Sequence, residues 1–411
     1  MRGAAGVFAA ALAARLGYWR LQGTLPLVGD ALEYDAFARN LVEAGRYLGP
    51  YGEAATRMPG YPLFLAGLRL IFGESPEAVI AAQCVLGAVT CVLLRDLARR
   101  FMPEGWALAC GVIAAFYHGM IAPAAYPASE TLYSFFLVLS VWALFRDVWP
   151  PLTRASAFAA LSACLYLVRP EPLPYIILTM ILMPTLGAKF SRKEALSALA
   201  IFTLITGLWV GRNFARFREL MPASSVGQNV KYLSLLLPAQ AQGLVPPERY
   251  EAPASLSELE REKDMSRAYR ELASSLTWPQ LVKSYLYNLA SILYPFLPAY
   301  DWTYAALVPF FLLGLREAVR RKELLPPAAA VLCSISIFIF FGGPASRYRQ
   351  GISPFIVLLA VAGMRAAAQA AGAARFRAWA GAWAASNFAV WVFSAQAREA
   401  ALFLRGVLWR H

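Results

Sequence analysis

The sequence predicts an all-α protein that crosses a membrane many times, and its composition is the first reason. Of 411 residues, 59% are hydrophobic and only 15% are charged, and the mean hydropathy is +0.50. Soluble proteins average about 45–50% apolar and about 25% charged residues. The apolar residues also gather in runs of near-spanning length, which favours a bundle of membrane helices over a buried soluble core.

The apolar runs give about eleven expected transmembrane helices. The first run follows Arg2 and has an Ala-rich core like that of a signal peptide. Because ten further runs follow it, we expect an uncleaved anchor in place of a removed signal. The expected spans are 4–19, 76–97, 106–125, 131–149, 155–168, 172–186, 195–210, 302–315, 325–341, 352–371 and 378–393.

Basic residues predict the orientation, because they gather in alternate short loops. The positive-inside rule makes the loops rich in Lys and Arg cytoplasmic, so the loop that contains Asp30 is expected outside. The net charge of +13 then mainly reflects the basic residues that set the orientation in the membrane. The sequence indicates no nucleic-acid-binding module. The basic loop residues are Arg95, Arg99, Arg100, Arg146, Arg154, Lys189, Arg192, Lys193, Arg316, Arg320, Arg321, Lys322, Arg365, Arg375 and Arg377.

The first outward loop, residues 20–61, combines several acids with Arg57, which stands directly before a rigid turn. Asp30, Glu33 and Asp35 open a stretch in which apolar residues recur at helical spacing, and this predicts an amphipathic helix along the membrane surface. Arg57 precedes the turn Met58–Pro59–Gly60–Tyr61–Pro62, which leads into an apolar run. We expect this loop to be the catalytic one.

A second polar segment, residues 212–280, is the long extracytoplasmic loop. Ser255 and Ser257, each with a Glu three residues later, suit a helix start. An apolar stripe follows it, made of Met265, Ala268, Tyr269, Leu272 and Leu276. A surface helix docked on the membrane core is expected. The loop is too short for much of a core of its own, so we expect one domain over residues 1–411.

Further charged residues mark the outward ends of other spans. They are Glu130, the Arg169–Pro170–Glu171 motif, Arg212 beside Trp209, and the Arg347–Tyr348–Arg349 motif. Charge is costly at a membrane and usually has a purpose there. Guanidinium groups bind phosphate through a planar fork, and a nearby carboxylate can take a proton from a hydroxyl group. The combination suits transfer from a phosphate-linked donor.

Each of these residues also has a structural interpretation. Asp30 followed by Glu33 suits a helix N-cap, and Glu130 suits the positive end of a helix dipole. Arg57 can snorkel to the interface, and Tyr61 can be an interfacial anchor as well as a sugar-stacking ring. The five cysteines fall inside predicted spans, and two histidines are too few for a histidine-rich metal site.

The order of these motifs resembles the GT-C superfamily of membrane glycosyltransferases. Within it, the match is to the branch of protein O-mannosyltransferases and lipid A aminoarabinose transferases. The resemblance implies a polyprenyl-phosphate-sugar donor and an inverting transfer on the outer face. By position, it implies that Asp30 is the catalytic base, Glu130 a second acid, and Arg57 a ligand of the donor phosphate. The family usually has two adjacent acids where this chain has Asp30–Ala31, so Glu33 is the candidate for the missing acid.

The sequence therefore predicts a glycosyltransferase of the cytoplasmic membrane whose acceptor is a lipid, a glycan or a protein. Arg169, Arg212 and Arg347 are expected to assist Arg57 at the phosphate, and Tyr34, Tyr61 and Tyr348 to contact substrate. A divalent metal between carboxylates and phosphate fits the same arrangement. Membrane lipids are the remaining expected partners. The alternatives are a flippase or exporter of lipid-linked sugars, and an O-antigen ligase or polymerase.

Overall fold

The computed structural model describes residues 2–185, 190–253, 255–294, 301–342 and 347–393. Every regular element in these residues is a helix. Contacts divide the chain into two compact units. The first comprises Met1–Ser224, Pro309–Cys333 and Gln350–Ala367, and the second comprises Ser225–Val308, Ser334–Arg349 and Ala368–His411. The expectation of a single domain over residues 1–411 stays a prediction.

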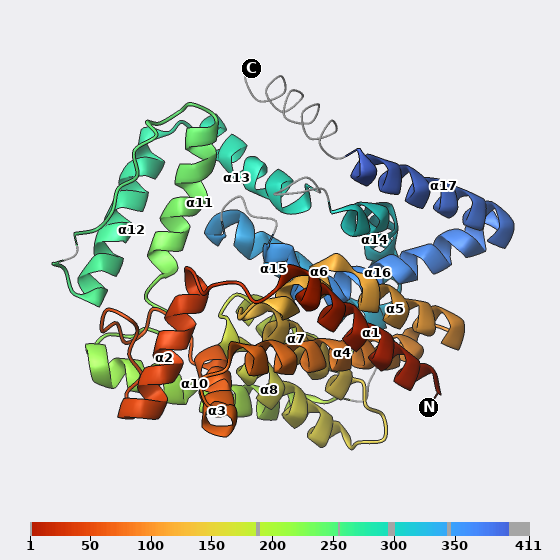
Figure 1. The fold of residues 1–411 in the computed structure, drawn as a ribbon, viewed down its shortest axis with the longest axis horizontal. Helices are drawn as coiled ribbons and strands as arrows, with labels where there is room; N and C mark the ends of the chain where they lie inside the picture. The colour runs from red at the N-terminus through yellow and green to blue at the C-terminus, as the bar shows by residue number, and fades with distance from the viewer. Residues whose placement is uncertain (1, 186–189, 254, 295–300, 343–346, 394–411) are drawn as a thin grey trace. The chain divides into compact units, whose positions relative to one another are not determined.

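The first unit is a bundle built mainly from the N-terminal half of the chain. In Figure 1, α4, α7 and α8 run side by side; α1 and α5 also pack on α4, and α10 packs on α8. The helices of this half are α1 (Arg2–Gln22), α2 (Asp30–Ala44), α3 (Gly60–Phe72), α4 (Pro76–Phe101), α5 (Glu104–Phe116), α6 (His118–Ile121), η1 (Ala122–Ala125), α7 (Glu130–Leu144), α8 (Pro151–Val168), α9 (Leu173–Leu182), η2 (Met183–Thr185) and α10 (Arg192–Phe217).

Three later helices contribute segments to both units. They are α14 (Trp302–Arg320), α15 (Leu325–Phe341), which follows the short helix η3 (Lys322–Leu324), and α16 (Tyr348–Ala371). The part of α16 in the first unit is the most deeply buried segment of the bundle, with residues 352–362 all buried. A helix that is apolar on all sides suits such a position.

The prediction of an all-α, multi-pass membrane protein is confirmed. Among the described residues, six helices are long and apolar enough to cross a membrane: α4, α8, α10, α14, Lys322–Phe341 and α16. Residues 104–125 make a seventh if the pair α5 and His118–Ala125, bent by 69°, counts as one span. The chain spans the membrane several times.

Four of the eleven expected spans fall outside this set. Those at 131–149 and 172–186 correspond to the shorter apolar helices α7 and Leu173–Thr185. Those at 4–19 and 378–393 correspond to α1 and to α17 (Ala373–Val392). In α1, the three arginines Arg2, Arg15 and Arg20 lower the mean hydropathy, and α17 has Arg375 and Arg377 near its start.

The second unit contains the surface helix predicted in the long loop. This helix, α12 (Glu258–Ser275), begins in a capping box formed by Ser257 and Glu260. Its apolar residues Met265 and Ala268 pack on Tyr232 and Leu236 of α11 (Gly227–Ala241), which the sequence analysis did not identify as a helix. The stripe on α12 therefore has a partner inside the long loop. Helix α13 (Trp278–Leu293) packs on α11 as well.

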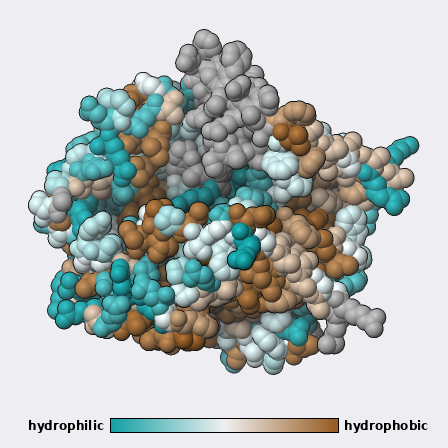
Figure 2. Space-filling view, viewed as in Figure 1, coloured by the Kyte–Doolittle hydropathy of each residue, from teal (hydrophilic) through white to brown (hydrophobic). Residues whose placement is uncertain are grey.

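The surface separates polar from apolar regions. Figure 2 shows hydrophilic residues gathered over α2, and hydrophobic residues over α1 and α4. Helix α2 has the predicted amphipathic character, because Tyr34, Phe37 and Ala38 are buried while Arg39 and Glu43 on the opposite face are exposed. The helix predicted to follow Asp30 is thus present.

Candidate active site

Asp30, Glu33 and Arg57 form one cluster of ion pairs. The Arg57 Nη2 atom donates to Asp30 Oδ1 at 2.7 Å, and its Nε atom donates to Glu33 Oε2 at 2.8 Å. The Arg57 side chain is 16% exposed, whereas those of Asp30 and Glu33 are 36% and 33% exposed. The arginine is therefore nearly enclosed, while both carboxylates still reach solvent.

The start of α2 explains why these acids face Arg57. Gly29 is the N-cap residue, and its φ of 54° and ψ of −125° lie in a region that other residues rarely adopt. No side chain caps the helix, so the N-cap interpretation of Asp30 is wrong. Asp30 is the first helical residue, and Glu33 lies three positions later on the same face. Both carboxylates can therefore pair with one guanidinium group.

A small glycine lets the Arg57 loop approach α8. A Cβ atom added at Gly60 would lie 2.7 Å from backbone atoms of Leu167 and Val168. Gly60 begins α3, three residues after Arg57, and Val168 ends α8, directly before Arg169. The glycine in the predicted turn thus permits the contact that brings these two arginine-bearing segments together.

Arg169 forms a second cluster with two acids. Its Nη1 atom lies 3.1 Å from Glu130 Oε1, its Nε atom donates to Glu171, and its guanidinium lies 5.9 Å from the centre of the Tyr133 ring. Glu130 is the first residue of α7 and is nearly buried. The sequence analysis named Glu171 only as part of a motif, and its contact with Arg169 gives it a place in the site.

Tyr34 lies between the two clusters. The Arg57 guanidinium lies 5.3 Å from the centre of the Tyr34 ring, and the Tyr34 hydroxyl donates to Ser129 Oγ at 3.4 Å, next to Glu130. Burial raises the pKa of Tyr34, against the opposing charges of Arg57 and Arg169. The hydroxyl group therefore stays neutral, and its ring joins the clusters into one site.

Both arginines remain charged in spite of burial. Burial by itself lowers the pKa of Arg57, but its hydrogen bond to Glu33 and the charge of Asp30 outweigh this effect and raise the pKa. For Arg169, burial is outweighed in the same way by Glu171 and Glu130. Each guanidinium is thus a fixed positive charge held by two carboxylates.

Tyr61 lies in the core and packs against Tyr34. It is completely buried, its ring packs edge-on against Tyr34 at 4.9 Å, and its hydroxyl donates to Gln83 Oε1 at 2.8 Å. Gln83 in turn donates to the Tyr126 carbonyl at 2.8 Å. The structure therefore places Tyr61 behind Tyr34, where it fixes that ring, and not at the surface that a sugar would contact.

Arg212 holds the first loop. Its Nη1 atom donates to the Ala54 carbonyl at 2.6 Å, and its Nη2 atom donates to the Tyr47 carbonyl at 3.2 Å. Its guanidinium also lies over the rings of Tyr47 and Trp209, at 5.4 and 5.0 Å. The Tyr47 hydroxyl then donates to the Arg57 carbonyl at 3.0 Å. Arg212 thus fixes the loop that carries Arg57.

Two predicted site residues belong to the second unit. Arg347 is the N-cap residue of α16, and its guanidinium lies 5.9 Å from the centre of the Tyr348 ring. The Tyr348 ring stacks on Phe338 at 4.4 Å. Their predicted roles in phosphate and substrate binding stay predictions.

The acids are not arranged as a metal site. Within the described part of the chain, no three His, Cys, Asp or Glu side chains converge closely enough to hold a metal ion. Asp30 and Glu33 are engaged with Arg57, and Glu130 and Glu171 with Arg169. As arranged, these residues do not fit a divalent metal.

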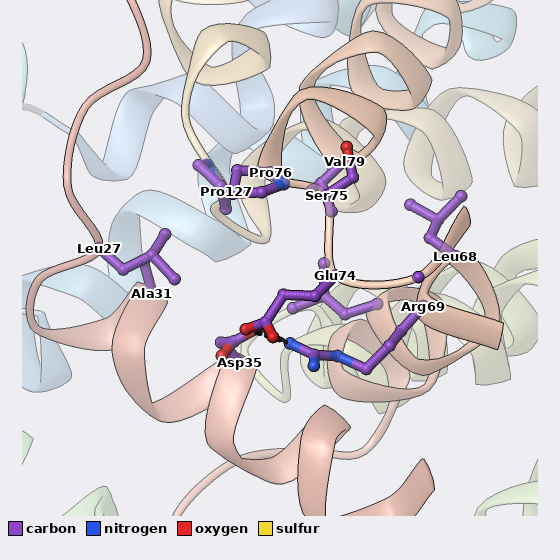
Figure 3. A pocket seen from close by; sticks show the side chains of 12 residues that line it. Leu27, Ala31, Asp35, Leu68, Arg69, Glu74, Ser75, Pro76, Val79 and Pro127 are labelled. Atoms are coloured by element: carbon purple, nitrogen blue, oxygen red, sulfur yellow. Dashed lines mark hydrogen bonds and ion pairs between the residues drawn. The ribbon is translucent and has the colours of Figure 1, made fainter. Parts of the chain in front are cut away.

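A second ion-pair group lies on another face of α2. Figure 3 shows Arg69 of α3 with Asp35 and Glu74 at a pocket of about 60 Å³. The Arg69 Nη2 atom lies 2.9 Å from Asp35 Oδ1 and 3.5 Å from Glu74 Oε1. These contacts join α2 to α3. Asp35 therefore pairs with Arg69, whereas Asp30 and Glu33 pair with Arg57, although all three acids lie within two turns of one helix.

No family model matches this chain, and no curated protein matches it. Solved structures do match it. The oligosaccharyltransferase of Archaeoglobus fulgidus, solved in complex with zinc and sulfate, aligns with 94% of this chain and 51% of its own, at 11% identity and a TM-score of 0.56. Archaeal oligosaccharyltransferase AglB from Archaeoglobus fulgidus, in complex with an inhibitory peptide and a dolichol-phosphate, aligns with 97% of this chain and 55% of its own, at 13% identity and a TM-score of 0.55.

Oligosaccharyltransferases of this kind are GT-C proteins, and the alignment covers nearly all of the chain. This chain has the GT-C fold. It spans about half the length of the oligosaccharyltransferase chains that it matches. ArnT from Cupriavidus metallidurans bound to undecaprenyl phosphate aligns with 89% of this chain and 77% of its own, at 15% identity and a TM-score of 0.40. The assignment of the fold rests on the two oligosaccharyltransferase alignments, and the branch within it stays a prediction.

Proposed function

We propose that this protein is an inverting glycosyltransferase that moves one sugar from a polyprenyl-phosphate carrier to an acceptor outside the cytoplasmic membrane. The observation that carries the proposal is the cluster in which Arg57 holds both Asp30 and Glu33. The GT-C fold supports it, because one GT-C protein of this fold was solved with a dolichol-phosphate. The sugar is a hexose or a pentose, and the acceptor is a lipid, a glycan or a protein.

Arg57 and Arg169 are the proposed ligands of the donor phosphate. Each presents a planar set of N–H donors that matches phosphate oxygens. Both are engaged with carboxylates, so phosphate oxygens would replace carboxylate oxygens around the guanidinium group. When Arg57 turns to the phosphate, its ion pair with Asp30 is broken, and the Asp30 carboxylate can act as a base. Donor binding would therefore activate the site.

Asp30 is the proposed base, and Glu33 is the second candidate. About a third of each side chain is exposed, so an acceptor hydroxyl group can reach it. The carboxylate takes the hydroxyl proton as the acceptor oxygen forms a bond to the anomeric carbon. The bond from that carbon to the phosphate oxygen breaks on the opposite side, and its electron pair stays on the phosphate. A single displacement of this kind inverts the anomeric centre.

Glu130 acts in this proposal by positioning Arg169. It is nearly buried at the start of α7, where an acid is stabilised by the helix dipole, and it pairs with Arg169 at 3.1 Å. Fixed positive charge near the leaving phosphate stabilises the charge that develops there. Arg212 contributes indirectly, by holding the loop that presents Arg57. Tyr34, whose ring centre lies 5.3 Å from the Arg57 guanidinium, is the proposed aromatic contact of the sugar.

The proposal is tested with purified protein in vesicles that contain radiolabelled polyprenyl-phosphate sugars and a membrane extract as acceptor source. Wild type should transfer label, and Asp30→Asn should lower the transfer rate by about 100-fold or more, the usual range for losing a general base. Asp35→Asn is the matched control, because Asp35 lies on the same helix but pairs with Arg69. Equal rates in Asp30→Asn and wild type would remove Asp30 from the reaction.

A further inference from the structure

The first unit contains a large apolar groove away from the candidate active site. Its volume is about 520 Å³, and three helices line it. Helix α9 contributes Leu178, Thr179 and Leu182; α14 contributes Leu315, Arg316, Ala318 and Val319; and α15 contributes Leu325, Pro326, Ala328, Ala329, Leu332 and Cys333. Ligand pockets in proteins have volumes of about 300–1,000 Å³, so the groove is large enough for part of a small molecule.

The groove lies at the other end of α9 from Arg169. Arg169 directly precedes the loop into α9, whereas Leu182 is the last residue of that helix. The ten residues of α9 span about 15 Å along its axis. The groove also includes the end of α14 and the start of α15. The basic segment 316–322 covers the last turn of α14 and the start of the connection to α15. The groove is therefore distinct from the Asp30 cluster and lies at the end of the bundle that carries basic loops.

The lining is apolar except for Thr179 and Arg316. Arg316 is exposed and, among the described residues, forms no ion pair, whereas Arg320 on the same helix pairs with Glu317. The rim carries large apolar side chains that reach the surface, including Val319, which is 84% exposed, and Leu332, which is 50% exposed. In a protein that spans a membrane, such residues face the hydrocarbon region. The groove thus combines an apolar lining with one exposed arginine, Arg316.

We propose that this groove binds one hydrocarbon chain of an anionic phospholipid, with Arg316 contacting the lipid phosphate. Basic pockets between membrane helices on the cytoplasmic side bind acidic lipid headgroups. Arginine suits this role because its planar fork matches phosphate and is less strongly hydrated than an ammonium group. The positive-inside rule assigns segment 316–322 to the cytoplasmic leaflet. The occupant is a bilayer lipid, and the site does not depend on the glycosyltransferase reaction.

The test uses full-length protein purified in detergent. Phosphatidylglycerol and phosphatidylcholine with identical chains are titrated separately, and native mass spectrometry counts the lipid molecules that remain bound. Wild type should retain one phosphatidylglycerol with at least about fivefold preference, since one basic residue near an acidic lipid contributes about 1 kcal/mol. Arg316→Ala should lose that preference. Ala329→Phe should reduce the binding of both lipids, because the added ring occupies the groove.

Two control variants separate the groove from the general surface. Arg320→Ala removes a basic residue from the same helix outside the groove and should keep the preference. Leu312→Phe adds bulk at a position that is 58% exposed on α14 and does not line the groove, so it should bind lipid as wild type does. Size-exclusion chromatography checks that each variant is folded. Equal binding of the two lipids by wild type, or an unchanged preference in Arg316→Ala, would overturn the proposal.

Discussion

The Arg57 guanidinium donates to Asp30 at 2.7 Å, so the proposed phosphate ligand and the proposed base are partners in one ion pair. The two residues are 27 positions apart, on the first turn of α2 and on the loop before α3. Their contact couples binding to chemistry, because a phosphate that takes Arg57 breaks its ion pair with Asp30. Before a donor binds, Asp30 and Glu33 together hold the Arg57 guanidinium in place.

The first prediction separates charge from geometry at Arg57. Arg57→Lys keeps a positive charge but loses the fork, so donor affinity should fall moderately. Arg57→Ala should cost more, about 2–3 kcal/mol for a lost charge-assisted contact. The measurement is binding of a polyprenyl-phosphate donor to both purified variants.

A purely interfacial role for Arg57 predicts a different result. Both variants would then bind the donor as wild type does, with small changes in stability only. Wild-type affinity in Arg57→Ala would remove Arg57 from the site. Because Asp30 and Glu33 are about one-third exposed, water can solvate them when Arg57 is absent, and Arg57→Ala should still fold.

The second prediction concerns the close approach at Gly60. Gly60→Ala would place a methyl group 2.7 Å from backbone atoms of Leu167 and Val168, which cannot move without displacing α8. We expect a loss of about 1–3 kcal/mol in stability, as for other overpacked sites. Transfer should also slow, since the Arg57 loop would move relative to Arg169. Thermal unfolding and the transfer assay measure the two effects.

Gly67 provides the matched control on the same helix. A Cβ atom there meets nothing within 4 Å. Gly67→Ala should therefore raise stability by up to about 1 kcal/mol through helix propensity and leave transfer unchanged. If Gly60→Ala behaves as Gly67→Ala does, the close approach has no part in positioning the site.

The third prediction tests the role of Arg212. If Arg212 holds the first loop through the Ala54 and Tyr47 carbonyls, Arg212→Lys should loosen that loop although the charge is kept. Protease cleavage within residues 45–59 should then become faster, and the transfer rate should fall. If instead Arg212 binds the donor phosphate, as the sequence favoured, Arg212→Lys should weaken donor affinity without changing the cleavage rate.

Sequence patterns predicted the helices near the site better than the pairing of its side chains. The periodicity after Asp30 corresponds to α2, whereas α3 begins at Gly60, inside the stretch predicted as a turn. Spacing suggested that Asp30 caps its own helix, but a glycine does so, and the acid pairs with Arg57 instead. Local spacing cannot distinguish these outcomes, because the partner lies 27 residues away and only the tertiary fold brings it close.

Arg15 illustrates another limit of sequence patterns. It lies inside an apolar run and is completely buried in the structure, where it donates to the carbonyls of Ala11 and Ala115. Carbonyl groups are present at every residue, so the sequence carries no signal for such partners. The same holds for Arg212, whose loop contacts are to carbonyls as well. Arg169 and Glu171, by contrast, lie in one motif, so the sequence does hold a local signal for their contact.

The last prediction tests the orientation on which the outward position of the site depends. Tyr51 in the first loop is 83% exposed, whereas the neighbouring Ala54 is only 2% exposed, so Tyr51 is the better labelling position. A cysteine introduced by Tyr51→Cys or by Glu251→Cys in the long loop should react with a membrane-impermeant maleimide in intact cells. Lys193→Cys, at an exposed position in a basic loop, should react only after the cells are opened. Wild type is the background control, because its cysteines are buried or half-buried. Labelling of Lys193→Cys alone in intact cells would reverse the topology, place Asp30 and Arg57 on the cytoplasmic side, and require a donor presented from that side.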